Sequence, residues 1–324
     1  MNTLPLLVKR EYWEHRGGFL WAPVWVTGIT LLLTVLGLVT AEIFRSRAHV
    51  QVGFSLDMLR QNIDAKDWAN AGYGLDVVQF VFGALPCIGL FFVLFFYLLG
   101  TLYDDRRDRS VLFWKSLPVS DGATVASKAV SAMLVAPLTA FAASTAAYIA
   151  FLVLVTLWTG AHGLNMLPAI AASHPFRTFG RLLMTIPLDA LWALPAIGWL
   201  MFWSAFARSK PFLWAVLLPL GVLFINWWLG VLGAPNISGD VRLATILGRL
   251  LLSVFPGSWM VARENGFGGL RGWFADDGQV LANVDAGHVL TMLSSANVWM
   301  GVAAGIALLA GAVWLRGRRI EVNV

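Results

Sequence analysis

The chain has 324 residues, of which 58% are hydrophobic and 13% are charged, and its formal net charge is +5. Soluble domains carry about 25% charged residues, so this composition excludes a disordered chain, a disulfide scaffold and an ordinary soluble enzyme. Its 16 Trp and 21 Phe favour a protein whose surface contacts lipid and headgroups. The single cysteine, Cys87, cannot form an internal disulfide.

Residues 1–17 precede the first long apolar stretch and are themselves amphipathic. Leu4, Leu7, Val8 and Tyr12 recur at helical spacing, and the basic side chains fall elsewhere. This pattern predicts an amphipathic helix that lies along the cytoplasmic membrane interface. The alternative is that the segment is a generic membrane anchor. The charges and the length of the following apolar run argue against a cleavable signal peptide.

Uncharged or nearly uncharged stretches long enough to cross a bilayer recur along the chain. A membrane-spanning helix needs about 20 mostly apolar residues. Six stretches meet this requirement, at about 18–41, 77–103, 129–158, 182–207, 212–232 and 296–315. The sequence therefore predicts an all-α integral membrane protein, with one six-span domain over 18–324.

The loop after the second predicted span, YDDRRDRSVLFWKSLPVSDGATVASK, joins a dense run of charges to an aromatic pair. The charges are Asp104–Arg109, and the pair is Phe113 and Trp114. Aromatic residues rimmed by charge are typical of docking surfaces, in which Trp and Arg are frequent anchors. An alternative is an aromatic pair at headgroup level with solvated flanking charges.

The same run also matches the pattern DDxxD at Asp104, Asp105 and Asp108. This pattern resembles the site of membrane prenyltransferases, in which carboxylates hold Mg²⁺ against a diphosphate. Two observations weigh against it: the loop at 207–211 has no acidic residue, and Arg106 and Arg107 compete for the carboxylates. An integral-membrane prenyltransferase stays as the alternative function.

Asp189 is a carboxylate within the fourth predicted span, between Pro187 and Pro195. Such a residue is costly in a membrane unless it is paired, neutral or in contact with water. One interpretation is a polar contact that lines a translocation route. The other, which the position only a few residues inside the predicted span favours, is an acid near the outer interface with Arg181 as its partner.

The predicted outer-face segment, 233–295, contains an apolar stretch at 243–262 with Arg249 near its middle. A full span there would bury this arginine at a cost of about 2.5–3.5 kcal/mol. We therefore predict a re-entrant or interfacial helix. In the last span, Gly301 and Gly305 form a GxxxG motif, which packs helices either within one subunit or between two.

Signatures of catalysis are missing from the sequence. It contains no GxxxxGK[ST] phosphate-binding loop, no HExxH motif and no GxSxG nucleophile elbow. We therefore predict no catalytic residue, no metal site and no cofactor in this chain. Lys and Arg are dense at both termini and in the short loops on the same side, so the positive-inside rule predicts that both termini are cytoplasmic.

Taken together, the sequence resembles the permease subunits of the ABC-2 type transporter family. The resemblance rests on the amphipathic N-terminus LLVKREYWEHR, on the charged and aromatic loop between spans two and three, and on the large segment between spans five and six. It implies a dimer, with a homodimer expected, and two separately encoded ATPase subunits that bind ATP and Mg²⁺. It also implies export of an amphipathic, lipid-like, drug or peptide cargo across a bacterial inner membrane, with no enzymatic activity in this chain.

The resemblance also implies roles for particular residues. The loop after the second span would act as a coupling helix seated in a groove of the ATPase. The expected ATPase contacts are Asp104, Asp105, Arg106, Arg107, Asp108, Arg109, Phe113, Trp114 and Lys115. The expected secondary contacts are Arg10, Glu11 and Glu14 on the N-terminal helix.

Overall fold

The computed structural model describes residues 3–48, 64–108, 119–233, 240–261 and 286–318, and every regular element in these ranges is a helix. The elements are α1 (Leu4–Glu14), the π-helix η1 (Gly17–Trp21), α2 (Ala22–Ala48), α4 (Ala65–Arg107), α6 (Asp121–Val130), the π-helix η2 (Ser131–Val135), α7 (Ala136–Ala161), α8 (Leu167–Ser173), α9 (Pro175–Phe206), α10 (Pro211–Val231), α11 (Asp240–Leu252), α12 (Ser258–Val261), α13 (Ala286–Ser294) and α14 (Ala296–Arg318).

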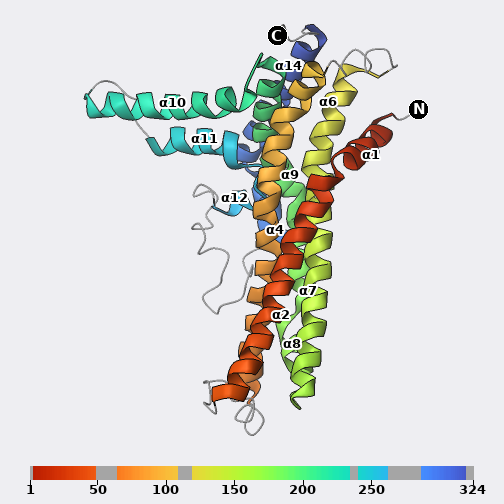
Figure 1. Ribbon diagram of the computed structural model, residues 1–324. Coiled ribbons are helices and arrows are strands. Elements are labelled where there is room, and N and C mark those ends of the chain that lie inside the picture. The colour runs from red at the N-terminus through yellow and green to blue at the C-terminus, as the bar shows by residue number, and fades with distance from the viewer. Residues whose placement is uncertain (1–2, 49–63, 109–118, 234–239, 262–285, 319–324) are drawn as a thin grey trace.

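Six of the described helices are long and apolar enough to cross a membrane, which confirms the prediction of a multi-pass all-α membrane protein. The six stretches are Gly17–Phe44, Lys66–Arg107, Asp121–Ala161, Leu167–Phe206, Pro211–Val231 and Ala296–Arg318. Four of them form an elongated bundle of α2, α4, α7 and α9, with α14 beside α9 (Figure 1). Helix α1 and the C-terminal end of α14 lie toward the same end of this bundle (Figure 1).

Several helices are longer than their predicted spans. The second stretch has 42 residues, so at 1.5 Å per residue it measures about 63 Å, roughly twice the thickness of the hydrocarbon core. The sequence-based boundary at 77 was set by the charge of Asp76, but the helix continues to Ala65. One part of α4 therefore extends outside the hydrocarbon region.

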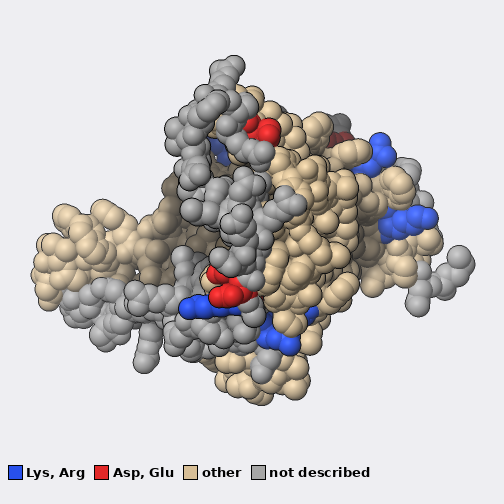
Figure 2. Space-filling view, turned by 90° about the horizontal axis from the view of Figure 1, so that it is seen from below, with Lys and Arg blue, Asp and Glu red and all other residues tan. Residues whose placement is uncertain are grey.

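Helix α10 departs from the direction of the bundle. It runs across the bundle axis as a projecting arm, with α11 beside it (Figures 1 and 2). The change of direction follows from the local sequence, because Lys210 has a left-handed backbone (φ 48°) and Pro211 occupies the first turn of α10. Trp199 Nε1 donates a hydrogen bond to Ala215 O at 3.0 Å, and this bond holds the base of the arm against α9.

One end of the molecule shows few charges among its described residues. Seen from this end, which is far from both termini, only a few charged side chains interrupt the surface (Figure 2). Exposed large apolar side chains are frequent on α2 and α10, where Trp25 and Phe224 are 66% and 60% exposed. These faces would be unstable in water and suit contact with lipid.

The buried core lies where α4, α6, α9 and α14 meet. Leu98 on α4, Ala129 on α6, Leu200 on α9 and Ala312 on α14 are among its fully or almost fully buried members. A second cluster joins α4, α7 and α8 around Tyr148, which is 0% exposed. The first of these cores supports the polar site described next.

Candidate functional site

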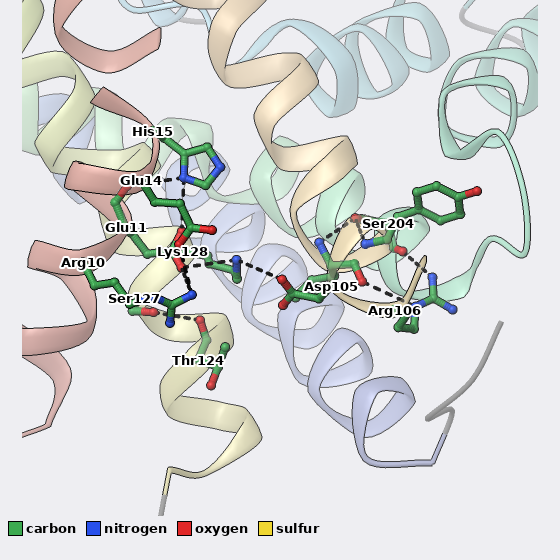
Figure 3. A network of polar contacts seen from close by, with 12 residues as sticks. Arg10, Glu11, Glu14, His15, Asp105, Arg106, Thr124, Ser127, Lys128 and Ser204 are labelled. Carbon is green, nitrogen blue, oxygen red and sulfur yellow. Dashed lines mark hydrogen bonds and ion pairs between the residues drawn. The ribbon is translucent and has the colours of Figure 1, made fainter. Parts of the chain in front are cut away.

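A cluster of alternating charges is buried at the end of the bundle that carries α1 and the end of α14 (Figure 3). Lys128 Nζ lies 3.2 Å from Glu11 Oε1 and 3.8 Å from Asp105 Oδ1. Arg316 Nη1 lies 2.8 Å from Asp105 Oδ2, and its Nε lies 3.1 Å from Asp121 Oδ1. These five residues, here called the ionic cluster, connect α1, α4, α6 and α14.

Burial makes the pairing in the ionic cluster obligatory. The side chains of Lys128 and Arg316 are each 3% exposed, and that of Glu11 is 1% exposed. Tyr97 on α4 donates a hydrogen bond from its hydroxyl group to Glu11 Oε2 at 3.0 Å. A charge in such surroundings is tolerated only when an opposite charge and hydrogen bonds compensate it, so α1 is fixed to the bundle through Glu11.

Helix α6 supplies two members of the ionic cluster, and its sequence explains their placement. Ser120 caps the helix by accepting a hydrogen bond from the Ala123 backbone N–H at 3.1 Å. Asp121 then occupies the first turn, and Lys128 follows seven positions later in the last turn. Seven residues make about two helical turns, so both side chains lie on the face turned toward α1, α4 and α14.

Arg106 forms a second polar junction between α4 and α9. Its Nη2 donates to Ser204 O at 2.6 Å and to Ala207 O at 3.0 Å, at the C-terminal end of α9. The Ser204 hydroxyl oxygen in turn accepts from the backbone N–H groups of Leu102 and Tyr103, each at 3.0 Å. The guanidinium thus caps carbonyl groups at the negative end of the α9 dipole.

We expect Arg106→Gln to lower the free energy of unfolding by about 2–3 kcal/mol, because charge-assisted hydrogen bonds to two buried carbonyl groups are lost. Arg106→Lys keeps the charge but not the planar fork, so it should restore only part of the stability. Thermal and denaturant unfolding of the purified protein in detergent measure both effects. Arg107→Gln, at an exposed neighbour, is the control, and equal losses in the three variants would contradict this role of Arg106.

The predicted docking run divides between two faces of α4. Asp105 and Arg106 point into the protein, where they join the ionic cluster and the α9 junction. Arg107 remains exposed and pairs with Asp104 at 3.4 Å and with Asp108 at 3.1 Å. The other predicted contacts in this loop lie outside the described residues, namely Arg109, Phe113, Trp114 and Lys115.

The predicted secondary contacts on α1 divide in the same way. Arg10 Nη2 and Glu14 Oε2 form an ion pair at 3.0 Å, with Glu14 exposed. Glu11 turns inward to Lys128 (Figure 3) and accepts the hydrogen bond of Tyr97. On the face of α1 that a partner can reach, the structure therefore presents Arg10 and Glu14 but not Glu11.

Asp189 lies near the middle of α9, because this helix begins at Pro175 and has 32 residues. The structure thus places it deeper than the predicted span boundary at 182 indicated. Its carboxylate Oδ1 accepts a hydrogen bond from the Gly257 backbone N–H at 2.7 Å. Gly257 belongs to the connection between α11 and α12, so a segment from the predicted outer-face region reaches the interior of the bundle.

Sequence reasoning missed Lys128, Arg316, Tyr97 and Ser204 as members of these junctions. Lys128 and Arg316 each stand at one end of an uncharged stretch, where they were used as span boundaries and as positive charges of the predicted cytoplasmic side. Their partners lie far away in the sequence; Arg316 and Asp105, for example, are 211 residues apart. One feature of the sequence could have indicated that Lys128 is part of a polar site: it lies on the same helical face as Asp121.

The site has the character of a mechanical junction. Each cation of the ionic cluster lies against two carboxylates, so the charges of these groups are neutralised by pairing within the cluster. No group of three or more His, Cys, Asp or Glu residues that could hold a metal ion occurs in the described ranges. What the arrangement does is hold α1, α4, α6, α9 and α14 together at one end.

The chain matches no known protein-family model, no curated protein sequence and no solved structure.

Proposed function

We propose that this chain is the transmembrane permease subunit of an ABC-2 type transporter. In this role it exports an amphipathic, lipid-like, drug or peptide cargo. Two copies of a separately encoded ATPase, which bind ATP and Mg²⁺, dock on the 104–118 loop of a homodimer. The protein lies in a bacterial inner membrane with both termini cytoplasmic, α1 lies along the interface, and the 243–262 segment is re-entrant or interfacial.

One observation carries this proposal: the two faces at the end of α4 have different partners. Arg107 and Asp108 are exposed and border the charged and aromatic loop, while Asp105 and Arg106 hold α6, α14 and α9. A force applied to the loop therefore reaches several long helices through short, buried contacts. A permease driven by a partner ATPase requires such a connection, because the energy is released outside its own chain.

The prenyltransferase alternative receives less support from the same contacts. Asp105, the second acid of the DDxxD pattern, lies between Lys128 and Arg316. Asp104 and Asp108 both lie against Arg107. A Mg²⁺ ion would have to displace these cations from all three carboxylates, so we do not adopt this function.

The proposal is tested by purifying the chain from its own cells in mild detergent and identifying the proteins that remain bound. We expect a protein with a GxxxxGK[ST] motif to co-purify, and we expect Arg107→Glu and Trp114→Ala each to reduce its amount by about tenfold, as loss of a central interface residue does. Arg318→Glu makes the same charge change at the same end of the molecule and is the control.

A chain that purifies without any ATPase would contradict the proposal. The same holds if Arg107→Glu and Arg318→Glu release the ATPase equally. In either case, Mg²⁺-dependent prenyl transfer by the isolated chain, and its loss in Asp104→Ala or Asp108→Ala, becomes the next measurement.

A further inference from the structure

A cavity lies inside the bundle, between α4, α7, α9 and the connection from α11 to α12. It has a volume of about 110 Å³ and is partly open to the surroundings. Its walls are mainly apolar and aromatic, and they include Phe80, Phe141, Phe179, Leu182 and Met260. The cavity belongs to a single copy of the chain.

The cavity is elongated along α9. Phe179 lines one part and Asp189 another, and ten residues of helix correspond to about 15 Å. Beside Asp189, the Gly257 backbone N–H holds one carboxylate oxygen at 2.7 Å. A slot of this shape suits an alkyl chain more closely than a compact ring system.

The polar atoms at this cavity call for hydrogen-bond donors. Gln79 is 2% exposed; its Nε2 donates to Pro175 O at 3.2 Å, and its Oε1 is buried without a hydrogen-bond partner. The buried Thr145 hydroxyl, which can donate or accept, is also without a hydrogen-bond partner. Both residues line the cavity together with Asp189. A buried acceptor without a donor costs free energy, so a ligand that donates hydrogen bonds is favoured here.

The charge of the cavity points to a cation. Asp189 is an acid near the middle of a long apolar helix, where an uncompensated carboxylate is costly. Among the described residues that line the cavity there is no Lys, Arg or His. Since the walls supply no positive group, the ligand is the natural source of the opposite charge.

We propose that this cavity binds a single-chain organic amine, with its ammonium group at Asp189 and its alkyl chain between Phe80, Phe141 and Phe179. The ammonium group donates to the carboxylate, and the apolar walls remove the chain from water or competing lipid. The site is complete within one copy of the chain, so this inference does not depend on an ATPase or on the proposed transport function.

The test uses the full chain in nanodiscs of a zwitterionic lipid, without ATP or any partner. The probe is dodecylamine that carries a photoreactive diazirine at the end of its chain, and cross-linked positions are mapped by peptide mass spectrometry. We expect cross-links on the cavity-lining parts of α4, α7 and α9. Unlabelled dodecylamine should compete with the probe, whereas dodecyl sulfate and dodecanol should not.

Three variants separate the contributions of charge and shape. Asp189→Asn keeps an oxygen acceptor for the Gly257 N–H, so the fold is retained, but we expect amine affinity to fall by about thirtyfold, as for loss of one partner of a buried charge pair. Gly83→Phe fills the cavity, because a Cβ at Gly83 meets only Leu182 Cδ1 at 3.8 Å, and it should abolish cross-linking. Gly37→Phe, on α2 where a Cβ meets nothing within 4 Å, is the control and should bind the amine as the parent does.

The proposal is overturned if dodecyl sulfate competes as well as dodecylamine, because the site then has no preference for a cation. It is also overturned if Asp189→Asn or Gly83→Phe binds the amine as Gly37→Phe does. Loss of ATPase co-purification, by contrast, would leave these results unchanged, so the two proposals fail separately.

Discussion

Lys128→Met should lower the free energy of unfolding by about 3–5 kcal/mol, because it removes the cation from a buried charge pair and leaves the Glu11 carboxylate without it, while Asp105 keeps Arg316. The ammonium group lies 3.2 Å from Glu11 Oε1 and 3.8 Å from Asp105 Oδ1, and the side chain is 3% exposed. Methionine matches the length of the lysine stem, so the loss reports the charge and not a cavity. Unfolding of the purified protein in detergent, followed by tryptophan fluorescence, measures it.

The double variant Glu11→Gln/Lys128→Met isolates the pair. Glutamine removes the unpaired carboxylate that Lys128→Met leaves buried, so the double variant should lose clearly less stability than the sum of the two single variants. Lys9→Met makes the same chemical change at an exposed position of α1, and it should change stability by no more than about 0.5 kcal/mol. If Lys128→Met behaved like Lys9→Met, the ionic cluster would not hold α1 to the bundle.

Hydropathy predicted the long helices because a helix that crosses a membrane must consist of about 20 mostly apolar residues. The predicted span at 212–232 differs by one residue at each end from α10, Pro211–Val231. The boundary of α4 was less accurate, at 77 against Ala65. Charge marks where a helix leaves the hydrocarbon core, but backbone hydrogen bonding continues the helix into water, and only a cap or a break ends it.

The division of the Asp104–Asp108 run between two faces follows from helical periodicity. Because α4 continues through Arg107, Asp105 follows the buried Leu98 and Thr101 at spacings of seven and four. Arg106 follows the buried Leu99 and Leu102 at the same spacings, whereas Arg107 falls on the opposite, exposed side of the helix. The sequence analysis treated this run as a loop, and a loop has no helical faces from which inward and outward side chains can be predicted. Extending the helix by five residues would have predicted Asp105 as an inward acid.

Other features depended on contacts that a single sequence does not encode locally. The identity of the partner of Lys128 required the packing of α1 against α6, and the depth of Asp189 required the true start of α9. The direction of α10 depended on one left-handed residue, Lys210, which composition does not reveal. Hydropathy indicates that a helix is long and apolar, but the turn before it decides where it points.

Gly305→Val should destabilise the protein by about 3 kcal/mol or more, because overpacking at a contact with backbone has no side chain that can move aside. A Cβ at Gly305 would lie 2.6 Å from the carbonyl carbon and oxygen of Leu194 and 2.9 Å from Pro195 N. A Cβ at Gly198 would likewise lie 2.6 Å from Gly305 O. Gly305, the second glycine of the GxxxG motif, and Gly198 thus let α14 and α9 approach closely. A Cβ at the first glycine of the motif, Gly301, would instead meet the Arg249 guanidinium group.

Measurements of the stability and the oligomeric state of Gly305→Val together distinguish a GxxxG contact within one chain from a contact between two chains. Because the contact joins two helices of one chain, Gly305→Val should lower the unfolding midpoint in detergent whatever the oligomeric state. Gly37→Val is the control, since a Cβ there meets nothing within 4 Å and valine favours a helix more than glycine does. A Gly305→Val protein with unchanged stability but altered assembly would instead place the motif between two copies, because the packing of α9 against α14 would then have tolerated the added methyl groups.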